Sequence, residues 1–275
     1  MKAVRVTLQP DGTLAILPLP LPSMHRKGET SADRYRKQST GEMPRGNTFD
    51  PIQSDFLRAI ALSEGKFTGL AGQPGSLLSI VLSGDLTLVA GPSQTSTLEA
   101  GDILLTDGDT SSQVTLDVRS PSRLVQIGVN PDFPGPDAKI QPPGTINPRA
   151  GSEPNIKRIY KGEDDRAYFT EFAELFPSEA DKWSTPRRIS GFRMLYWEDG
   201  WTDYHPCVIS QIGIFSSGEL EMEVGGGGGA KQIFRAGDLC LAEDRTGEGH
   251  LNRIRGGVHS INIVIETEDL WPYKP

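Results

Sequence analysis

The sequence contains one pattern of strands and turns twice. Residues 79–91 read SIVLSGDLTLVAG and residues 212–225 read IGIFSSGELEMEVG. A second pair of phrases follows, TLEAGDILLTDGDT from Thr97 and IFRAGDLCLAEDRT from Ile233. The two copies lie about 135 residues apart, and a repeat of that length means two similar domains in one chain.

Composition indicates what kind of domain is repeated. The chain has 275 residues, of which 36% are hydrophobic, with 31 Gly and 21 Pro. This length suits two ordinary domains, each able to bury a core. Frequent glycine and proline favour many short strands joined by turns over long helices. We therefore expect an all-β protein.

The expected domains have boundaries that can be read from the turns and prolines. The first unit takes residues 1–135 and begins with a hairpin over 2–20, which turns at Pro10-Asp11-Gly12. A Pro- and Gly-rich linker spans 136–154, and the second unit takes 155–275. Within these units, residues 54–63 fit either a short helix or an edge strand, and residues 170–182 suggest one helix. The polar segment 21–50 wraps the first unit or stays mobile.

Charge and cysteine content exclude several classes of function. The net charge is −8, which repels a phosphate backbone, so we expect no nucleic-acid partner. No apolar run approaches the length of a membrane span, and the two cysteines, Cys207 and Cys240, make no disulfide framework. We expect a cytoplasmic monomer or homodimer that acts on a small molecule.

One stretch of the second unit, residues 200–218, carries a motif. It reads GWTDYHPCVISQIGIFSSG, and its histidine is His205. Further on, GDLCLAEDRTGEGH ends at His250. The pattern of strand, Gly, strand and Gly-Asp, present in both units, resembles the cupin superfamily. The phrases DYHP and AEDRTGEGH are similar to those of uncharacterised small cupins with D-W-H-P and A-E-D-x-T-G-x-G-H.

The resemblance implies two tandem cupin barrels of the double-stranded β-helix, or jelly-roll, type. Cupin metal sites normally use three His and one Glu. Here His205 matches the first His, Cys207 replaces the second, Gln211 replaces the Glu, and His250 arrives two residues late. The carboxylate that helps to hold a divalent cation is therefore missing. We expect no cofactor; a divalent metal, if one binds, would use His205, His250 and Gln211, or Zn would use Cys207 with both His.

Strand alternation indicates which side chains share the interior of the second barrel. His205, Cys207, Gln211 and Phe215 have one parity and are expected on one face. From the aromatic run 192–201 we expect strand alternation to send some of Arg193, Tyr196 and Trp197 towards the same interior. No histidine lies between His25 and His205, so the first barrel has no imidazole of its own and is expected to be structural.

These residues leave several interpretations open. The favoured one is a metal-independent enzyme, a cyclase, isomerase or pericyclase of specialised metabolism that acts on an apolar conjugated substrate. His205 or His250 would act as general acid or base, and Gln211 would donate to a developing oxyanion. Arg193, Tyr196, Trp197, Cys207 and Phe215 would bind the substrate. A metal-dependent cupin dioxygenase and a non-catalytic ligand-binding bicupin are the alternatives. The two histidines would otherwise be polar groups hydrogen-bonded inside a barrel.

Overall fold

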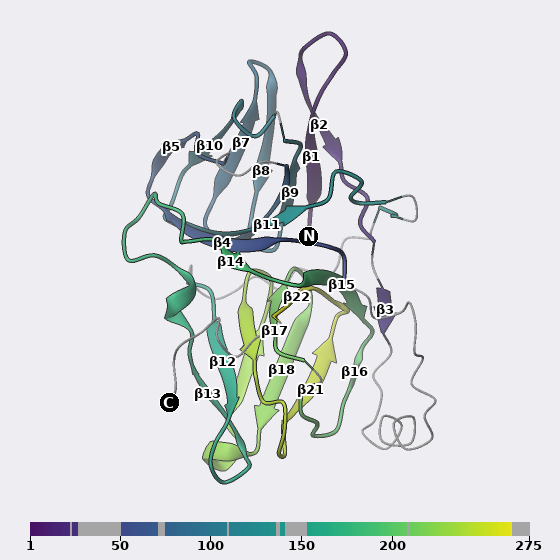
Figure 1. Ribbon diagram of the computed structural model, residues 1–275, viewed down its shortest axis with the longest axis vertical. Coiled ribbons are helices and arrows are strands. Elements are labelled where there is room, and N and C mark those ends of the chain that lie inside the picture. The colour runs from purple at the N-terminus through teal and green to yellow at the C-terminus, as the bar shows by residue number, and fades with distance from the viewer. Residues whose placement is uncertain are drawn as a thin grey trace.

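The protein is built of β-sheets throughout its described part (Figure 1). The computed structural model describes residues 1–22, 24–26, 51–70, 75–108, 110–135, 138–140, 153–207 and 209–265. Four sheets form two pairs, and each pair makes one barrel-like sandwich. The expected all-β class is confirmed, and the arrangement is consistent with tandem cupin barrels. No helix among these residues is long and apolar enough to span a bilayer.

The first sandwich pairs a seven-stranded sheet with a four-stranded one. The orders are β14-β4-β11-β6-β9-β1-β2 and β5-β10-β7-β8. The strands of this half are β1 (Ala3–Leu8), β2 (Leu14–Pro18), β4 (Phe56–Leu62), β5 (Gly65–Phe67), β6 (Ser76–Ser83), β7 (Leu86–Ala90), β8 (Gln94–Leu98), β9 (Ile103–Thr106), β10 (Val114–Val118) and β11 (Ser122–Val129). The expected hairpin over 2–20 is present as β1 and β2.

The second sandwich has the same plan. Its sheets have the orders β13-β12-β20-β17-β22-β15-β3 and β16-β21-β18-β19. The strands of this half are β12 (Ile156–Lys161), β13 (Ala167–Glu171), β15 (Gly191–Trp197), β16 (Gly200–Trp201), β17 (Gln211–Phe215), β18 (Glu219–Val224), β19 (Lys231–Phe234), β20 (Leu239–Ala242), β21 (His250–Arg255) and β22 (Val258–Val264). Read in opposite directions, the two seven-stranded orders match strand for strand, so the sequence repeat is a repeat of topology.

Two short strands cross from one half to the other. β14 (Arg187–Arg188) belongs to the second half of the sequence but pairs with β4. β3 (Met24–Arg26) belongs to the first half but pairs in parallel with β15. Sheet membership therefore departs from the order of the sequence at these two strands, and each half supplies the outermost strand of the other's large sheet.

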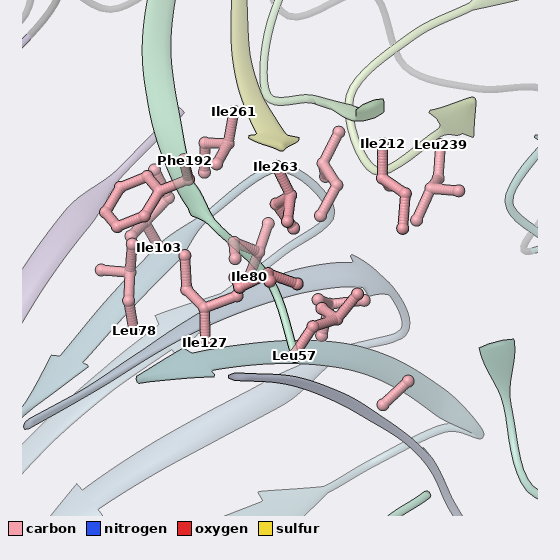
Figure 2. Packing of buried hydrophobic residues seen from close by; sticks show 14 of the residues in the cluster. Leu57, Leu78, Ile80, Ile103, Ile127, Phe192, Ile212, Leu239, Ile261 and Ile263 are labelled. Atoms are coloured by element: carbon pink, nitrogen blue, oxygen red, sulfur yellow. The ribbon is translucent and has the colours of Figure 1, made fainter. Parts of the chain in front are cut away.

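The two large sheets face each other across one continuous core (Figure 2). Leu57, Leu78 and Ile80 from the first half lie in the same cluster as Ile212 and Ile263 from the second. All five side chains are at most 1% exposed. Burying each such side chain stabilises the fold by about 1.5–3 kcal/mol, so the shared core joins the halves strongly.

The repeated Gly-Asp phrases are explained by contacts at the domain interface. A Cβ placed on Gly101 would lie 2.5 Å from the carbonyl oxygen of Ser216, in the other half. A Cβ on Gly237 would collide in the same way with the carbonyl oxygen of Leu82. Both glycines also have positive φ angles, +88° and +84°. The interface thus needs glycine at both places.

The aspartates of these phrases hold the start of each half. Asp238 accepts hydrogen bonds from the backbone N–H of Asn155 at 2.7 Å and of Arg235 at 2.6 Å. Asp102 does the same for Lys2 and Glu99 at 2.5 and 3.0 Å. Burial raises the pKa of Asp102 above its ordinary value. Asp102 therefore links the start of β1 to the turn before β9, and Asp238 links the start of β12 to the turn before β20.

The helix expected over residues 170–182 is wrong. Ala167–Glu171 forms β13, which pairs with β12, and only a single 3₁₀ turn follows, Ala173–Leu175. Leu175 packs into the shared core, and Pro177 directs the chain away from helical geometry soon afterwards. The ambiguous segment 54–63 is the strand β4, and it lies inside the sheet because β14 covers its outer side. Most of segment 21–50 and of the linker 136–154 lies outside the described residues.

Candidate functional site

Strand alternation in the large sheet selects the side chains that face the inside of the second sandwich. In β17, Ile212 and Ile214 join the shared core, so Gln211 and Phe215 face the inside. Phe215 packs there with Leu220, Met222, Val224, Phe234 and Ile254. The interior therefore has an apolar wall on the four-stranded sheet.

The same alternation corrects one expected site residue. In β15, Phe192 and Met194 join the shared core, which places Arg193 and Trp197 on the inside. Tyr196 has the parity of Met194 and lies on the opposite face of the sheet. Its ring is 4.6 Å from that of His259. Of the three residues considered, Tyr196 therefore does not face the interior, and its expected place among the substrate-binding residues is corrected, because it belongs to the other side of the strand.

His205 and His250 meet inside the second sandwich. Their ring centroids are 4.8 Å apart at an interplanar angle of 50°. His205 is 9% exposed and His250 is 4% exposed. Each backbone N–H donates to the other's carbonyl oxygen at 3.0 Å, which makes an isolated antiparallel bridge. The DYHP phrase and the phrase that ends at His250 therefore bind each other directly.

The segment that carries His205 and Cys207 is not a regular strand. β17 begins only at Gln211, so the expectation of one strand from 205 to 215 is wrong in its first part. Pro206 lacks a backbone donor, and it interrupts any ladder here. Instead the His250 bridge holds His205, and the backbone N–H of Cys207 donates to the carbonyl oxygen of Asp244 at 3.0 Å.

A glycine beside His250 allows the two segments to approach. Gly249 has a φ of +76°, and a Cβ there would collide with the carbonyl group of His205. Any other residue would be strained in its backbone and would push the two histidine segments apart.

Asp244 was not among the expected site residues, although the position of its turn near the second motif left open that the turn borders the pocket. Its Oδ2 lies 2.7 Å from Nδ1 of His250, and its side chain is fully buried. A carboxylate in this position keeps the proton of a neutral imidazole on Nδ1 and leaves Nε2 as the acceptor. His205 is oriented similarly, because its Nδ1 lies 2.7 Å from the carbonyl oxygen of Asp203, which can only accept. The sequence signal was the AEDRTG phrase, where adjacent acids suggest a solvated turn.

A chain of hydrogen bonds crosses the inner face of the seven-stranded sheet towards His205 and His250. Nε1 of Trp197 donates to Ser260 at 3.2 Å, and Ser260 donates to Asn262 at 2.8 Å. Asn262 donates to Oε1 of Gln211 at 3.1 Å, and Nε2 of Gln211 donates to Sγ of Cys207 at 3.6 Å. The chain connects the expected substrate-binding residues Trp197 and Cys207 through Gln211. It also leaves Gln211 one further N–H with which to contact a ligand.

Asn252 is a second polar residue of the interior that sequence reasoning missed. It lies on β21, two residues after His250, and is 8% exposed. Its Oδ1 has no hydrogen-bond partner among the residues that the structure describes. A buried amide oxygen without a donor costs free energy, so this one is a candidate for contact with a bound molecule.

The cysteines are thiols with different surroundings. Complete burial, then the nearby Asp244 and Cys207, raise the pKa of Cys240 well above its ordinary value. Cys240 lies in the apolar cluster with Phe215, so it is a packing residue.

The described residues do not fit a metal site. Nowhere in the described ranges do three His, Cys, Asp or Glu side chains come together as metal ligands would. The Gln211 oxygen, the third ligand expected if a metal binds, already accepts from Asn262. The carboxylate beside the imidazoles, Asp244, is hydrogen-bonded to Nδ1 of His250, so it does not stand as a further ligand in the way the glutamate of the usual cupin set does.

The first sandwich has a different interior. Arg58 is 4% exposed, and its Nε donates to Oε1 of Gln126 at 2.8 Å. Trp183, from the second half, stacks on the guanidinium at 4.0 Å and donates to the carbonyl oxygen of Gly69. Burial lowers the pKa of Arg58 to about 10. By strand pairing, Val114 occupies the position of His250.

A small pocket opens away from the histidine pair. It lies between the two halves, and its lining includes Met1, Leu21, Ser216 and His259. His259 lines this pocket because it lies on the same face of β22 as Ile261. This pocket does not involve the side chains that the sequence motifs bring together.

No family model matches the chain, and no curated protein matches it. Solved structures do. A Cupin 2 conserved barrel domain protein from Leptotrichia buccalis has 12% identity and a TM-score of 0.38, covering 78% of this chain and 84% of its own. A DUF861-family protein of unknown function from Pseudomonas syringae has 15% identity and a TM-score of 0.37, covering 96% and 100%. The Lactobacillus farciminis oxalate decarboxylase in complex with formate has 13% identity and a TM-score of 0.29, covering 78% of both chains. These similarities are too distant to assign an activity.

Proposed function

We propose that the second sandwich is the site of a metal-independent enzyme that moves a proton within an apolar conjugated small molecule. Isomerisation, cyclisation and dehydration are reactions of this kind. The observation that carries the proposal is the buried Asp244–His250 pair. At a solvated turn, water would replace the hydrogen bond between Asp244 and His250, so the pair can act in this way only because it is buried.

The geometry supports distinct roles for the residues. Nε2 of His250 takes a proton from a carbon or hydroxyl group of the substrate, and Asp244 stabilises the imidazolium that forms. His205, 4.8 Å away between ring centroids, takes this proton over from His250 and delivers it to another position of the substrate. Gln211 donates to the oxygen on which negative charge develops. The molecule leaves with its atoms rearranged or with water lost, and the protein ends in its starting protonation state.

The mass of the product tests this proposal against the alternatives. The purified protein is incubated with a small-molecule extract, and substrates and products are followed by mass spectrometry. A product of unchanged mass, or of mass lower by one water, is expected. A product heavier by one dioxygen molecule, with stoichiometric metal and loss of activity on chelation, would establish the dioxygenase instead. A ligand that is retained unchanged would mean a binding protein.

Variants then test the residues. Asp244→Asn and His250→Ala should each lower turnover at least a hundredfold, the scale of a lost general base. Glu243→Gln is the matched control, since Glu243 is the adjacent carboxylate and pairs with Arg158. The assigned roles are wrong if His250→Ala and His205→Ala both turn over like the wild type.

A further inference from the structure

Tyr204 connects the outer face of the second four-stranded sheet with the histidine pair inside the sandwich. Its Oη donates to Oε1 of Glu223 on β18 at 3.0 Å. Glu223 lies on the charged outer face of β18, because it alternates with residues that pack inside. The next residue in the chain, His205, is buried, and its ring lies 4.8 Å from that of His250. Two adjacent residues of one short segment therefore contact opposite faces of the same sheet.

This segment, between β16 and β17, is not a regular strand. The backbone N–H of Thr202 donates to the carbonyl oxygen of Asn252 at 2.8 Å, and the bridge between His205 and His250 follows three residues later. Tyr204 lies between these two points, where a side-chain contact can set the direction of the chain.

The position of Tyr204 also affects the group that orients the imidazole. Nδ1 of His205 lies 2.7 Å from the carbonyl oxygen of Asp203. That carbonyl belongs to the planar peptide unit that joins Asp203 to Tyr204. Because Tyr204 lies between the carbonyl and His205, a rotation of its backbone moves the acceptor relative to the ring. A Tyr204 side chain that is held in place therefore keeps the acceptor and the ring aligned.

Glu223 is itself held in place for this bond. Its Oε2 accepts from Nη1 of Arg253 at 2.8 Å and lies 3.2 Å from Nζ of Lys231. Hydrogen bonding from Arg253 lowers the pKa of Glu223 to about 2, and burial, together with the bond to Glu223, raises the pKa of Tyr204 to about 12. At neutral pH the proton therefore stays on the phenol and the charge on the carboxylate, which makes the hydrogen bond about twice as strong as a neutral one.

The first sandwich shows that the sheet itself does not need this carboxylate. By strand pairing, Val89 occupies the position of Glu223, and Val114 occupies the position of His250. A four-stranded sheet of the same plan therefore forms without the carboxylate. The carboxylate on the outer face and the histidine on the inner face occur together in the second half, which indicates that the first serves the second.

We propose that Tyr204 and Glu223 are positioning residues, which hold the imidazole of His205 in the direction and tautomer that proton transfer from His250 requires. With Nδ1 of His205 donating to Asp203, Nε2 is the atom that accepts this proton. Tyr204 and Glu223 act from the outer face, through the backbone between Asp203 and His205. The inference rests on the proposed function for the purpose of the histidine pair, and it adds how the pair is kept in order.

Imidazole NMR spectra test the inference without a substrate. Protein labelled with ¹⁵N in its histidines is compared with Tyr204→Phe, which loses one oxygen atom and keeps the ring. His205→Gln and His250→Gln assign the signals. The wild type should show the Nδ1–H tautomer at His205, and Tyr204→Phe should lose or average this signature. Wild-type imidazole signals in Tyr204→Phe overturn the proposal, and so does the other tautomer at His205 of the wild type.

Carboxylate variants separate positioning from stability. Glu223→Gln keeps an oxygen that accepts from Tyr204 and should retain the wild-type imidazole signals, whereas Glu223→Leu should change them as Tyr204→Phe does. Glu221→Leu is the matched control, because Glu221 also pairs with Arg253 and Lys231. It should lower stability and leave the imidazole signals unchanged. An equal change of the signals in Glu221→Leu contradicts the proposal, and if Glu223→Leu fails to fold, Tyr204→Phe and Glu221→Leu decide the question.

Turnover separates this inference from the proposed function. With a substrate in hand, Tyr204→Phe should lower kcat about tenfold and leave KM unchanged, as the loss of an interaction needed only in the transition state does. If turnover depends on His250 but Tyr204→Phe keeps the wild-type kcat and imidazole signals, the reaction stands and the positioning role fails. If no substrate is turned over but the imidazole of His205 reorients in Tyr204→Phe, the proposed reaction fails and the assignment of Tyr204 as the residue that orients His205 stands.

Discussion

Gly249 and Gly228 share a backbone conformation but not their surroundings. Their φ angles are +76° and +77°, yet nothing lies within 4 Å of a Cβ on Gly228, whereas a Cβ on Gly249 would collide with His205. At the residue scale, the difference between the costs of substituting these two glycines measures how much the close approach of the two histidine segments contributes to stability.

We therefore predict unequal costs for two identical changes. Gly228→Ala should lower the free energy of unfolding by about 1–2 kcal/mol, the cost of a left-handed backbone for a residue with a Cβ. Gly249→Ala should cost clearly more, because His205 must also move. Urea denaturation of both variants checks this, and equal costs would show that the contact with His205 is unimportant.

The Asp244–His250 pair gives a second prediction at this scale. Replacing Asp244 by Ala leaves a buried imidazole N–H without its acceptor and should cost about 1–3 kcal/mol of stability. A double-mutant cycle with His250→Ala should show a coupling of about 0.5–3 kcal/mol. Additive effects of the two changes would mean that the residues do not interact in solution.

Single residues also show the limits of sequence reasoning. The meeting of His205 and His250 follows from two motifs that must lie on one barrel. Asp244 was missed because a carboxylate between Glu243 and Arg245 has the local pattern of a solvated turn, and only the fold of that turn buries it. Tyr196 was misplaced because the register of β15 was not fixed by its own sequence, in which both faces carry large apolar residues.

At the scale of elements, strand parity was predictable wherever one face is charged. Glu219, Glu221 and Glu223 alternate with buried residues in β18, and the charged face pairs with Arg253 and Lys231 on the neighbouring strands. The absence of a helix over 170–182 was not predictable, since helix-forming residues there are overridden by pairing with β12 and by packing of Leu175. The irregular segment before Gln211 was likewise not predictable, because the long-range bridge between His205 and His250 holds it.

The charged face of β18 predicts a pH dependence. Hydrogen bonding from Arg253, with smaller contributions from Tyr204 and Lys231, lowers the pKa of Glu223 from 4.5 to about 2. Because the folded-state pKa is the lower one, this stabilisation is present above pH 4.5 and is lost as the pH falls towards 2. The stability difference between wild type and Glu223→Gln should shrink over that range in urea titrations. Glu179→Gln, whose carboxylate is 68% exposed, is the control and should show little change.

At the scale of the whole molecule, the two halves are joined by one core and by exchanged strands. Their large sheets share a core, and β3 and β14 each complete the sheet of the other half. The duplication and the all-β class were evident from the sequence. The exchange of strands was not, because each exchanged segment is only two or three residues long and has no pattern of its own.

This arrangement predicts how the halves behave apart. A fragment that begins within the 136–154 segment and contains the second half would expose Ile212, Ile214, Leu239, Ile261 and Ile263 to water. It should be insoluble or self-associated when produced alone, and co-production with the first half should restore a soluble complex. Gel filtration and urea unfolding measure both. A soluble monomeric fragment with a cooperative transition would contradict the prediction.

The paired glycine contacts have a consequence for how such a chain can change over time. Gly101 and Gly237 each rest against the backbone of the opposite copy, so a substitution at either one is felt by both. The side chains inside the two sandwiches have no such reciprocal pair of contacts, although Trp183 of the second half packs on Arg58 in the first. The interface between the halves must therefore stay nearly symmetric, while the two interiors can diverge in sequence. One half is free to acquire a catalytic role as long as the other half keeps the interface intact.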